Sequence, residues 1–290
     1  MSNHARLALH LSEESVALDA TQVLKPYPTP SKNNPITEYF ATANNLARKI
    51  TRSEHANDSE ILGLLLLGVV SGAEFYFRSV LGATVNICPL CKQNTELLQV
   101  PIASFDFYEG SGYSSALGTF EHESLADARK IRNECKRFTG FELGEDSSVA
   151  KAIQDFEILC ELRHCLVHAS GFAGLKACRT LGAEQRSLQK LVIDQRQAFE
   201  LMKLSHNAVR AFNRFLADSI LNRWVDRDVF TGKWKSDKPR FSAVVEAFWI
   251  KGEDQYGAIA WNAYRPFQKA VLARKRAMAT RVAPGTSTTS

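Results

Sequence analysis

An apolar stretch, ILGLLLLGVV, runs from Ile61 to Val70 and constrains the fold more than any other feature of the chain. The preceding residues 57–60, NDSE, supply side chains that cap helix N-termini and an early acidic residue. We therefore expect a long helix from this point to about Leu81. Because ten consecutive apolar residues are too few to cross a bilayer, this helix is expected to lie at the centre of a bundle.

Further helices are expected near residues 37–50, 123–140, 147–170 and 194–224, and Gly140 and Gly171 are expected to end two of them. The fold class is therefore all-α, a helical bundle with a small β or loop insertion and a C-terminal helical extension. The insertion contains the β-like string LLQVPIASFDFY. The expected organisation is an N-terminal segment with a proline-rich linker (1–35), a helical domain (36–225) with the insertion at about 82–118, a basic C-terminal region (226–282) and a disordered tail (283–290).

The cysteines and the N-terminus indicate the compartment in which the protein works. Six cysteines lie mainly in apolar or helical stretches, and Met1 to Ala20 lack a basic start followed by an apolar run. We expect a cytoplasmic protein with free thiols and no membrane partner.

The net charge of +5 is distributed unevenly along the chain. Residues 223–281 contain 13 lysines and arginines against six acidic residues, so the positive excess lies near the C-terminus. Such an excess can attract phosphate backbones, although a solvated helix face explains it equally well. Four tryptophans lie among or beside these cations and predict either a stacking surface for bases or a small aromatic core: Trp224, Trp234, Trp249 and Trp261.

The string ELRHCLVHASG, residues 161–171, places several polar side chains in an otherwise apolar helix. At 100° per residue, one polar stripe contains Glu157, Glu161, His164 and His168. The long side chain of Arg163 reaches this stripe from its edge. Cys165 falls on the opposite, core-facing arc. The polar residues therefore gather on one side of the last helical turns.

Three interpretations of this stripe remain open. Polar side chains at a helix C-terminus interact favourably with its exposed carbonyls. Alternatively, His164 and His168, with Glu161 one turn earlier, have the spacing of metal ligands, but the chain lacks a second Glu-x-x-His motif. The third interpretation is RNA cleavage, in which a histidine moves a proton and Arg163 neutralises a phosphate. Cys165 with a histidine base is a weaker nucleophile candidate, because no orienting Asn or Asp is evident.

The string RHCLVH fits an R-x4-H pattern and, with its surroundings, resembles the HEPN superfamily, in particular ribonucleases of the RiboL-PSP-HEPN type. The resemblance spans about residues 36–225. It implies a HEPN-like helical bundle that acts as a dimeric, metal-independent endoribonuclease, often as a toxin or in anti-phage defence. By this resemblance Arg163 binds the scissile phosphate, His168 acts as general base or acid, and His164 orients the pair or touches RNA.

The resemblance also extends to SGAEFYFRSVL, residues 71–81, which is similar to an earlier HEPN helix. It makes Glu74 and Arg78 supporting candidates facing the same cleft, although an i,i+4 ion pair explains them without a function. The expected partners are RNA, a second copy of the chain, and an antitoxin or defence-system component. The alternative function is a non-catalytic HEPN-like module that binds a partner or nucleic acid.

A second motif, ICPLCK, contains Cys88 and Cys91 at the spacing of half a zinc site. No second CxxC exists, and only Cys135, His122 and Cys178 could complete the set within the chain. We expect no cofactor for catalysis, and this motif leaves open a structural zinc, two free thiols or a redox pair.

Overall fold

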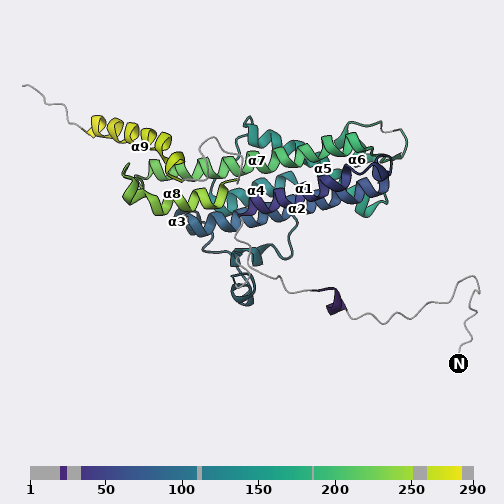
Figure 1. The fold of residues 1–290 in the computed structure, drawn as a ribbon, viewed down its shortest axis with the longest axis horizontal. Helices are drawn as coiled ribbons and strands as arrows, with labels where there is room; N and C mark the ends of the chain where they lie inside the picture. Colours follow the sequence, from purple (N-terminus) through teal and green to yellow (C-terminus); the bar gives the residue numbers. More distant parts are fainter. Residues whose placement is uncertain (1–19, 25–33, 110–112, 185, 251–259, 283–290) are drawn as a thin grey trace, which may run out of the picture.

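The computed structural model describes residues 20–24, 34–109, 113–184, 186–250 and 260–282. Most of the expected N-terminal segment and linker, and the expected disordered tail, lie outside these ranges. The described residues form an elongated bundle of helices, with a smaller lobe on one side (Figure 1). The all-α prediction is confirmed, and the described residues add only one two-stranded sheet to the helices.

Helix α2 (Ser59–Ile87) is the central helix that the apolar run predicts. It begins where NDSE places it, because the Asp58 side chain accepts a hydrogen bond from the Ile61 N–H at 3.0 Å. It extends to Ile87, beyond the expected end near Leu81. By length and composition α2 could cross a membrane. The same apolar composition is explained by burial in the bundle, because α2 packs against α1 (Pro35–Ile50), α5 (Ser148–His168) and α7 (Gln195–Asp226).

Aromatic side chains form the centre of the bundle. The ring of Phe77 on α2 meets Phe156 on α5 and Phe212 on α7, at centroid distances of 5.7 and 5.2 Å. Helix α4 (Ala128–Thr139) packs beside α2 and α5 and ends at Gly140, whose φ of +67° gives the predicted glycine cap. Burial of these rings is a major source of stability for the helices that carry the polar stripe.

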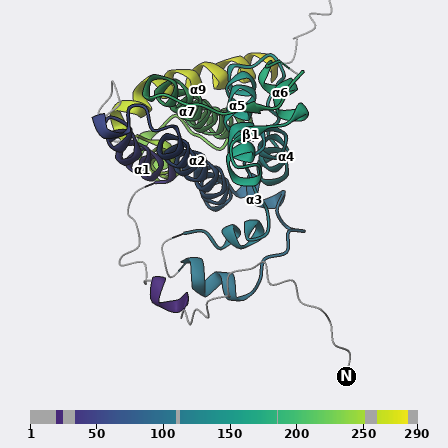
Figure 2. The same ribbon diagram turned by 90° about the vertical axis from the view of Figure 1, so that its right-hand side faces the viewer.

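The insertion between α2 and α4 forms a lobe that hangs away from the bundle (Figure 2). After α3 (Pro89–Gln93), which packs against α2 and α4, the lobe contains a π-helical turn η3 (Phe105–Glu109) and a 3-10 helix η4 (Ser115–Phe120). The expected β-structure in LLQVPIASFDFY is not found, since the described residues of this segment form turns and helical turns. A short strand needs a partner strand, and no described segment pairs with these residues.

The small sheet lies instead after α5. Strand β1 (Phe172–Ala173) pairs antiparallel with β2 (Gln189–Lys190), and α6 (Leu175–Leu181) lies between them in the chain. Two short 3-10 helices complete the N-terminal half, η1 (Ala20–Val23) and η2 (Ser53–His55). The sheet covers the end of the bundle at which α5 stops.

The C-terminal extension begins as part of the bundle. Helix α8 (Trp234–Phe248) contacts α1, α2 and α7, and α9 (Ala260–Val282) packs on α8. The rings of Trp234 and Trp261 lie 5.2 Å apart at this junction, and Trp224 is buried in the main core. These three tryptophans therefore take part in an aromatic core.

Candidate functional site

The end of α5 is shaped by its last backbone hydrogen bonds. The N–H groups of Ala169 and Gly171 both donate to the Cys165 carbonyl, at 3.1 and 3.0 Å. Ser170 and Gly171 have φ values of +50° and +84°, a backbone region that glycine adopts most readily. The helix therefore ends within a few residues of His168, as the glycine predicts, and leaves its last turns at the surface.

Arg163, His164 and His168 lie together on these last turns. His164 and His168 are exposed, and their ring centroids are 4.9 Å apart with the rings tilted by 49°. Arg163 is half-buried and forms no hydrogen bond or ion pair with any residue that the structure describes. Because burying part of a cation without a partner costs free energy, this guanidinium is available to an anion from outside the chain.

Glu161 does not belong to the exposed stripe, contrary to the helical projection. Its side chain is buried, and one of its carboxylate oxygens lies 3.9 Å from Lys176 Nζ on α6. The projection treats the helix as isolated, whereas α6 and β1 pack over this side of α5. Among the described residues no group of three or more His, Cys, Asp or Glu side chains is placed to hold a metal ion. The two histidines therefore have no third ligand within the described chain.

Cys165 lies on the core side, as the projection predicts. It packs with Ala173, Ala177 and Cys178 in a small cluster at the end of the bundle. Burial raises the pKa of the Cys165 thiol, and the nearby Glu161 carboxylate adds to the effect. A raised pKa keeps the sulfur protonated near neutral pH, which makes Cys165 a poor nucleophile.

Glu74 and Arg78 form the i,i+4 ion pair, at 2.7 Å, that explains them without a function. Glu74 also accepts a hydrogen bond from the Leu125 N–H at 2.8 Å, and Arg78 donates to the Glu123 carbonyl. The pair thus anchors the segment that leads into α4. Glu74 and Arg163 both lie close enough to Cys160 to act on its pKa, but the partners of Glu74 and Arg78 among the described residues do not include Arg163, His164 or His168.

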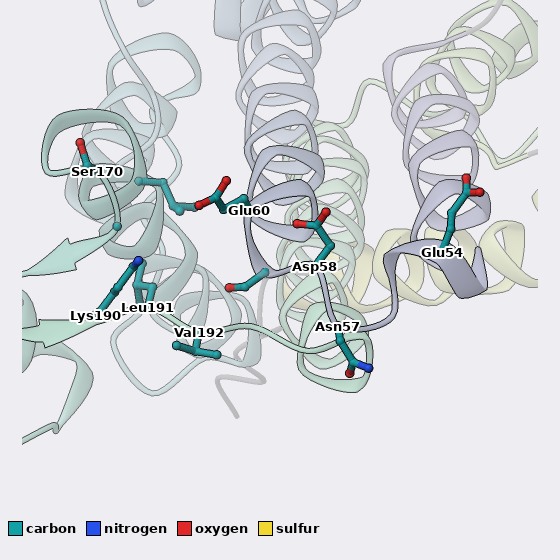
Figure 3. Close-up of a pocket in the computed structure, with 11 residues that line it drawn as sticks. Glu54, Asn57, Asp58, Glu60, Ser170, Lys190, Leu191 and Val192 are labelled. Carbon is teal, nitrogen blue, oxygen red and sulfur yellow. The ribbon is translucent and has the colours of Figure 1, made fainter.

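A pocket of about 680 Å³ lies beside the end of α5 (Figure 3). Ser170 and Gly171 line it, but Arg163, His164 and His168 do not. Its charged lining residues are three acids and one cation, with the carboxylates on the η2–α2 side and the cation on β2: Glu54, Asp58, Glu60 and Lys190. Sequence reasoning missed this pocket, because its residues come from segments far apart in the chain and share no motif. Its acidic lining disfavours a phosphate there.

Cys88 and Cys91 lie at the junction of α2 and α3 and are both fully buried. A hydrogen bond with the Cys91 side chain lowers the pKa of Cys88 to about 6 against the opposing effect of burial. The same hydrogen bond, together with burial, raises the pKa of Cys91. Arg223 Nη1 lies 3.5 Å from Cys91 Sγ and donates to the Thr139 carbonyl at 2.7 Å. The pair is therefore built to share one thiol proton beside a guanidinium.

This environment does not fit a complete zinc site within the described chain. Two thiols supply half of the four ligands that structural zinc needs, and His122 is exposed on the lobe while Cys178 packs near Cys165. Cys135 lies close enough to Cys91 to raise its pKa, but it does not complete a ligand group. The Arg223 guanidinium beside Cys91 also repels a metal cation. A zinc shared between two chains stays a prediction, for which elemental analysis is the test.

Comparison of the chain with models of known families, with curated proteins and with solved structures found no match. The resemblance of RHCLVH to the HEPN superfamily therefore stays a prediction. What the described geometry adds is the position of Arg163, His164 and His168 on one accessible surface at a helix end.

Proposed function

We propose that this protein is a metal-independent endoribonuclease of the HEPN type, with Arg163, His164 and His168 as its active-site residues. The observation that carries the proposal is the half-buried Arg163, which has no anionic partner among the described residues and lies on the same helix end as two exposed histidines in ring contact. A cation and a group that titrates near neutral pH are what cleavage of a phosphodiester requires.

The proposed reaction uses the 2′-hydroxyl of RNA as nucleophile. A histidine removes its proton, the 2′-oxygen attacks the adjacent phosphorus, and the bond from phosphorus to the 5′-oxygen breaks. A second acid protonates the departing 5′-oxygen, which leaves a 2′,3′-cyclic phosphate and a 5′-hydroxyl end. Arg163 neutralises the charge that develops on the phosphoryl oxygens. His168 serves as base or acid, and His164 orients it or touches the RNA.

A homodimer would supply the second proton-transfer group, since two α5 ends facing each other bring two histidines to one phosphate. Exposed apolar side chains beside the histidines support such an interface. Val167 is 48% exposed between His164 and His168, and Phe172 on β1 is 41% exposed. We propose that a second copy covers these side chains, because burying apolar surface stabilises association.

The cellular role rests on the resemblance alone. We propose a cytoplasmic toxin or anti-phage effector that is held in check by an antitoxin or defence-system partner.

The test is cleavage of total cellular RNA by the purified protein in the presence of a chelator. We expect the intact protein to cleave and His168→Ala or Arg163→Ala to lower the rate at least about a hundredfold. The expected cyclic phosphate and 5′-hydroxyl ends are identified by end-labelling.

His122→Ala and Arg227→Ala are the matched controls, because both side chains are exposed and lie outside α5, His122 on the insertion and Arg227 at the C-terminal end of α7. They should cleave at the rate of the intact protein. Cleavage that survives His168→Ala, or that stops when the chelator is added, contradicts the proposal.

The second candidate function is a non-catalytic module that binds a partner or nucleic acid through the same surface. It is favoured by the pocket beside α5, which Arg163, His164 and His168 do not line and whose acidic side chains disfavour RNA. RNA binding without cleavage, lost in Arg163→Ala, would support this module.

A further inference from the structure

The insertion lobe, defined here as residues 93–127, has a charge opposite to that of the rest of the chain. Between Lys92 and Arg129 the sequence contains six acidic residues and no lysine or arginine, while the whole chain carries +5. Three of the acidic residues have partners within the chain. Glu121 accepts from the Tyr108 hydroxyl, Glu123 lies 3.5 Å from Lys130 Nζ, and Asp127 caps α4.

The other three acidic residues are exposed, and they form no ion pair with any described residue: Glu96, Asp106 and Glu109. They are neighbours in sequence of unusually exposed apolar side chains. Leu97 is 94% exposed and Ile102 is 88% exposed. Fifteen large apolar side chains are exposed among the described residues, and four of them lie between residues 97 and 107. These four are Leu97, Ile102, Phe105 and Phe107.

Exposed apolar side chains on a monomeric protein are normally scattered, and a concentration of them marks an interaction surface. Here they stand on a lobe that projects from the bundle (Figure 2). The lobe is also attached firmly. Tyr113 donates to Glu38 on α1 at 3.0 Å, and Ser114 hydrogen-bonds to Asn86 on α2 at 3.3 Å. A surface that is already held in place loses less entropy when a partner binds.

We propose that the insertion lobe docks a partner protein through a segment that is both basic and apolar. The apolar side chains of the lobe supply the area that the partner buries. Glu96, Asp106 and Glu109 favour a partner that has lysine or arginine side chains around its apolar residues. RNA does not fit this surface, because its phosphates would meet unpaired carboxylates. The inference does not rest on RNA cleavage, since the lobe and the Arg163 cluster belong to different parts of the molecule.

The test measures binding of a fluorescent amphipathic peptide of leucine and lysine to the full chain by anisotropy. A peptide of leucine and glutamate with the same pattern is the matched probe. One variant carries Leu97→Ser, Ile102→Ser and Phe107→Ser, and a second carries Glu96→Gln, Asp106→Asn and Glu109→Gln. The control carries Leu64→Ser and Leu188→Ser, which replace side chains that are each 66% exposed and lie outside both the lobe and the pocket beside α5.

We expect the leucine–lysine peptide to bind, the leucine–glutamate peptide not to bind, and the apolar variant to raise Kd at least about tenfold. The acid-to-amide variant should bind weakly and lose the salt dependence shown by the intact protein. The control should bind as the intact protein does. Circular dichroism of each variant checks that the fold is retained.

Four results would overturn the proposal. The first three are equal binding of both peptides, an unchanged Kd in the apolar variant, and an equal loss of binding in the control. The fourth is self-association of the intact protein that the apolar variant abolishes, because the occupant would then be a second copy of the chain.

Discussion

At the scale of single residues, Asp237 on α8 is a buried carboxylate that accepts four hydrogen bonds. It is 1% exposed and accepts hydrogen bonds from the backbone N–H groups of Thr231 and Gly232, each at 2.8 Å. The hydroxyl groups of Thr231 and Tyr264 donate to it at 2.8 and 2.5 Å. One carboxylate thus joins the loop after α7 to α8 and α9.

We predict that Asp237→Ala lowers the free energy of unfolding by about 2–4 kcal/mol, because it leaves several buried donors without an acceptor. Chemical denaturation monitored by circular dichroism measures the loss. The matched control is Asp226→Ala, which breaks only an exposed ion pair to Arg274 at 3.0 Å and should cost less than about 1 kcal/mol. Equal losses in the two variants would contradict this account.

The same carboxylate predicts a pH dependence. Burial alone would raise the pKa of Asp237, but the hydrogen bonds from Tyr264, Thr231 and Gly232 outweigh it and hold the pKa below its usual value. The stabilising contribution is therefore present above the unfolded pKa, near about 4, and is lost as pH falls through the lower folded pKa. Asp237→Ala should remove this acid-side dependence, as denaturation curves across the acid range would reveal.

At the scale of elements, two glycines of α2 differ in how closely neighbouring side chains pack against them. A methyl group at Gly72 would meet Tyr39 and Thr42 of α1 at 3.8 Å, an ordinary contact distance. At Gly82 the same group would lie 3.0 Å from Ser114 Cβ on the lobe, which is tighter than side chains normally allow. The two positions therefore differ in the room that their neighbours leave.

We predict that Gly72→Ala stabilises the protein by about 0.5–1 kcal/mol, because alanine favours a helix over glycine and the space accommodates its methyl group. Gly82→Ala gains the same helix propensity but should show no net increase, since Ser114 must move. The difference between their midpoints of thermal unfolding measures the effect. A destabilised Gly72→Ala would show that α1 and α2 pack more tightly than these distances indicate.

At the scale of the whole molecule, the proposed activity depends on a second copy of the chain. We predict that Val167→Glu converts a dimer to a monomer and lowers RNA cleavage in parallel, because it places a charge where apolar surface is to be buried. Sedimentation equilibrium and the cleavage assay measure the two effects together.

Ile102→Glu is the control for this experiment, since Ile102 is exposed on the lobe rather than at the end of α5. It should leave both mass and activity unchanged. A monomeric Val167→Glu variant that still cleaves at the full rate would show that one chain holds a complete active site.

The fold could be predicted well where its signals are local. The NDSE capping residues and the apolar run placed the start of α2, and Gly140 and Gly171 placed the ends of α4 and α5. Capping and glycine backbone preferences act over a few residues, so a sequence contains them in full. The β-like string in the insertion was misleading, because a strand depends on a partner that only the fold supplies.

In the candidate site, too, some features follow from local sequence signals and others from tertiary contacts. The 3.6-residue period alone placed His164 and His168 on one side of α5 and Cys165 on the other, as found. Only the tertiary structure buried Glu161 under α6, joined Glu74 and Arg78 to the segment before α4, and left Arg163 without a partner among the described residues. Which groups meet is decided by contacts between helices far apart in the chain, and helical periodicity carries no information about them.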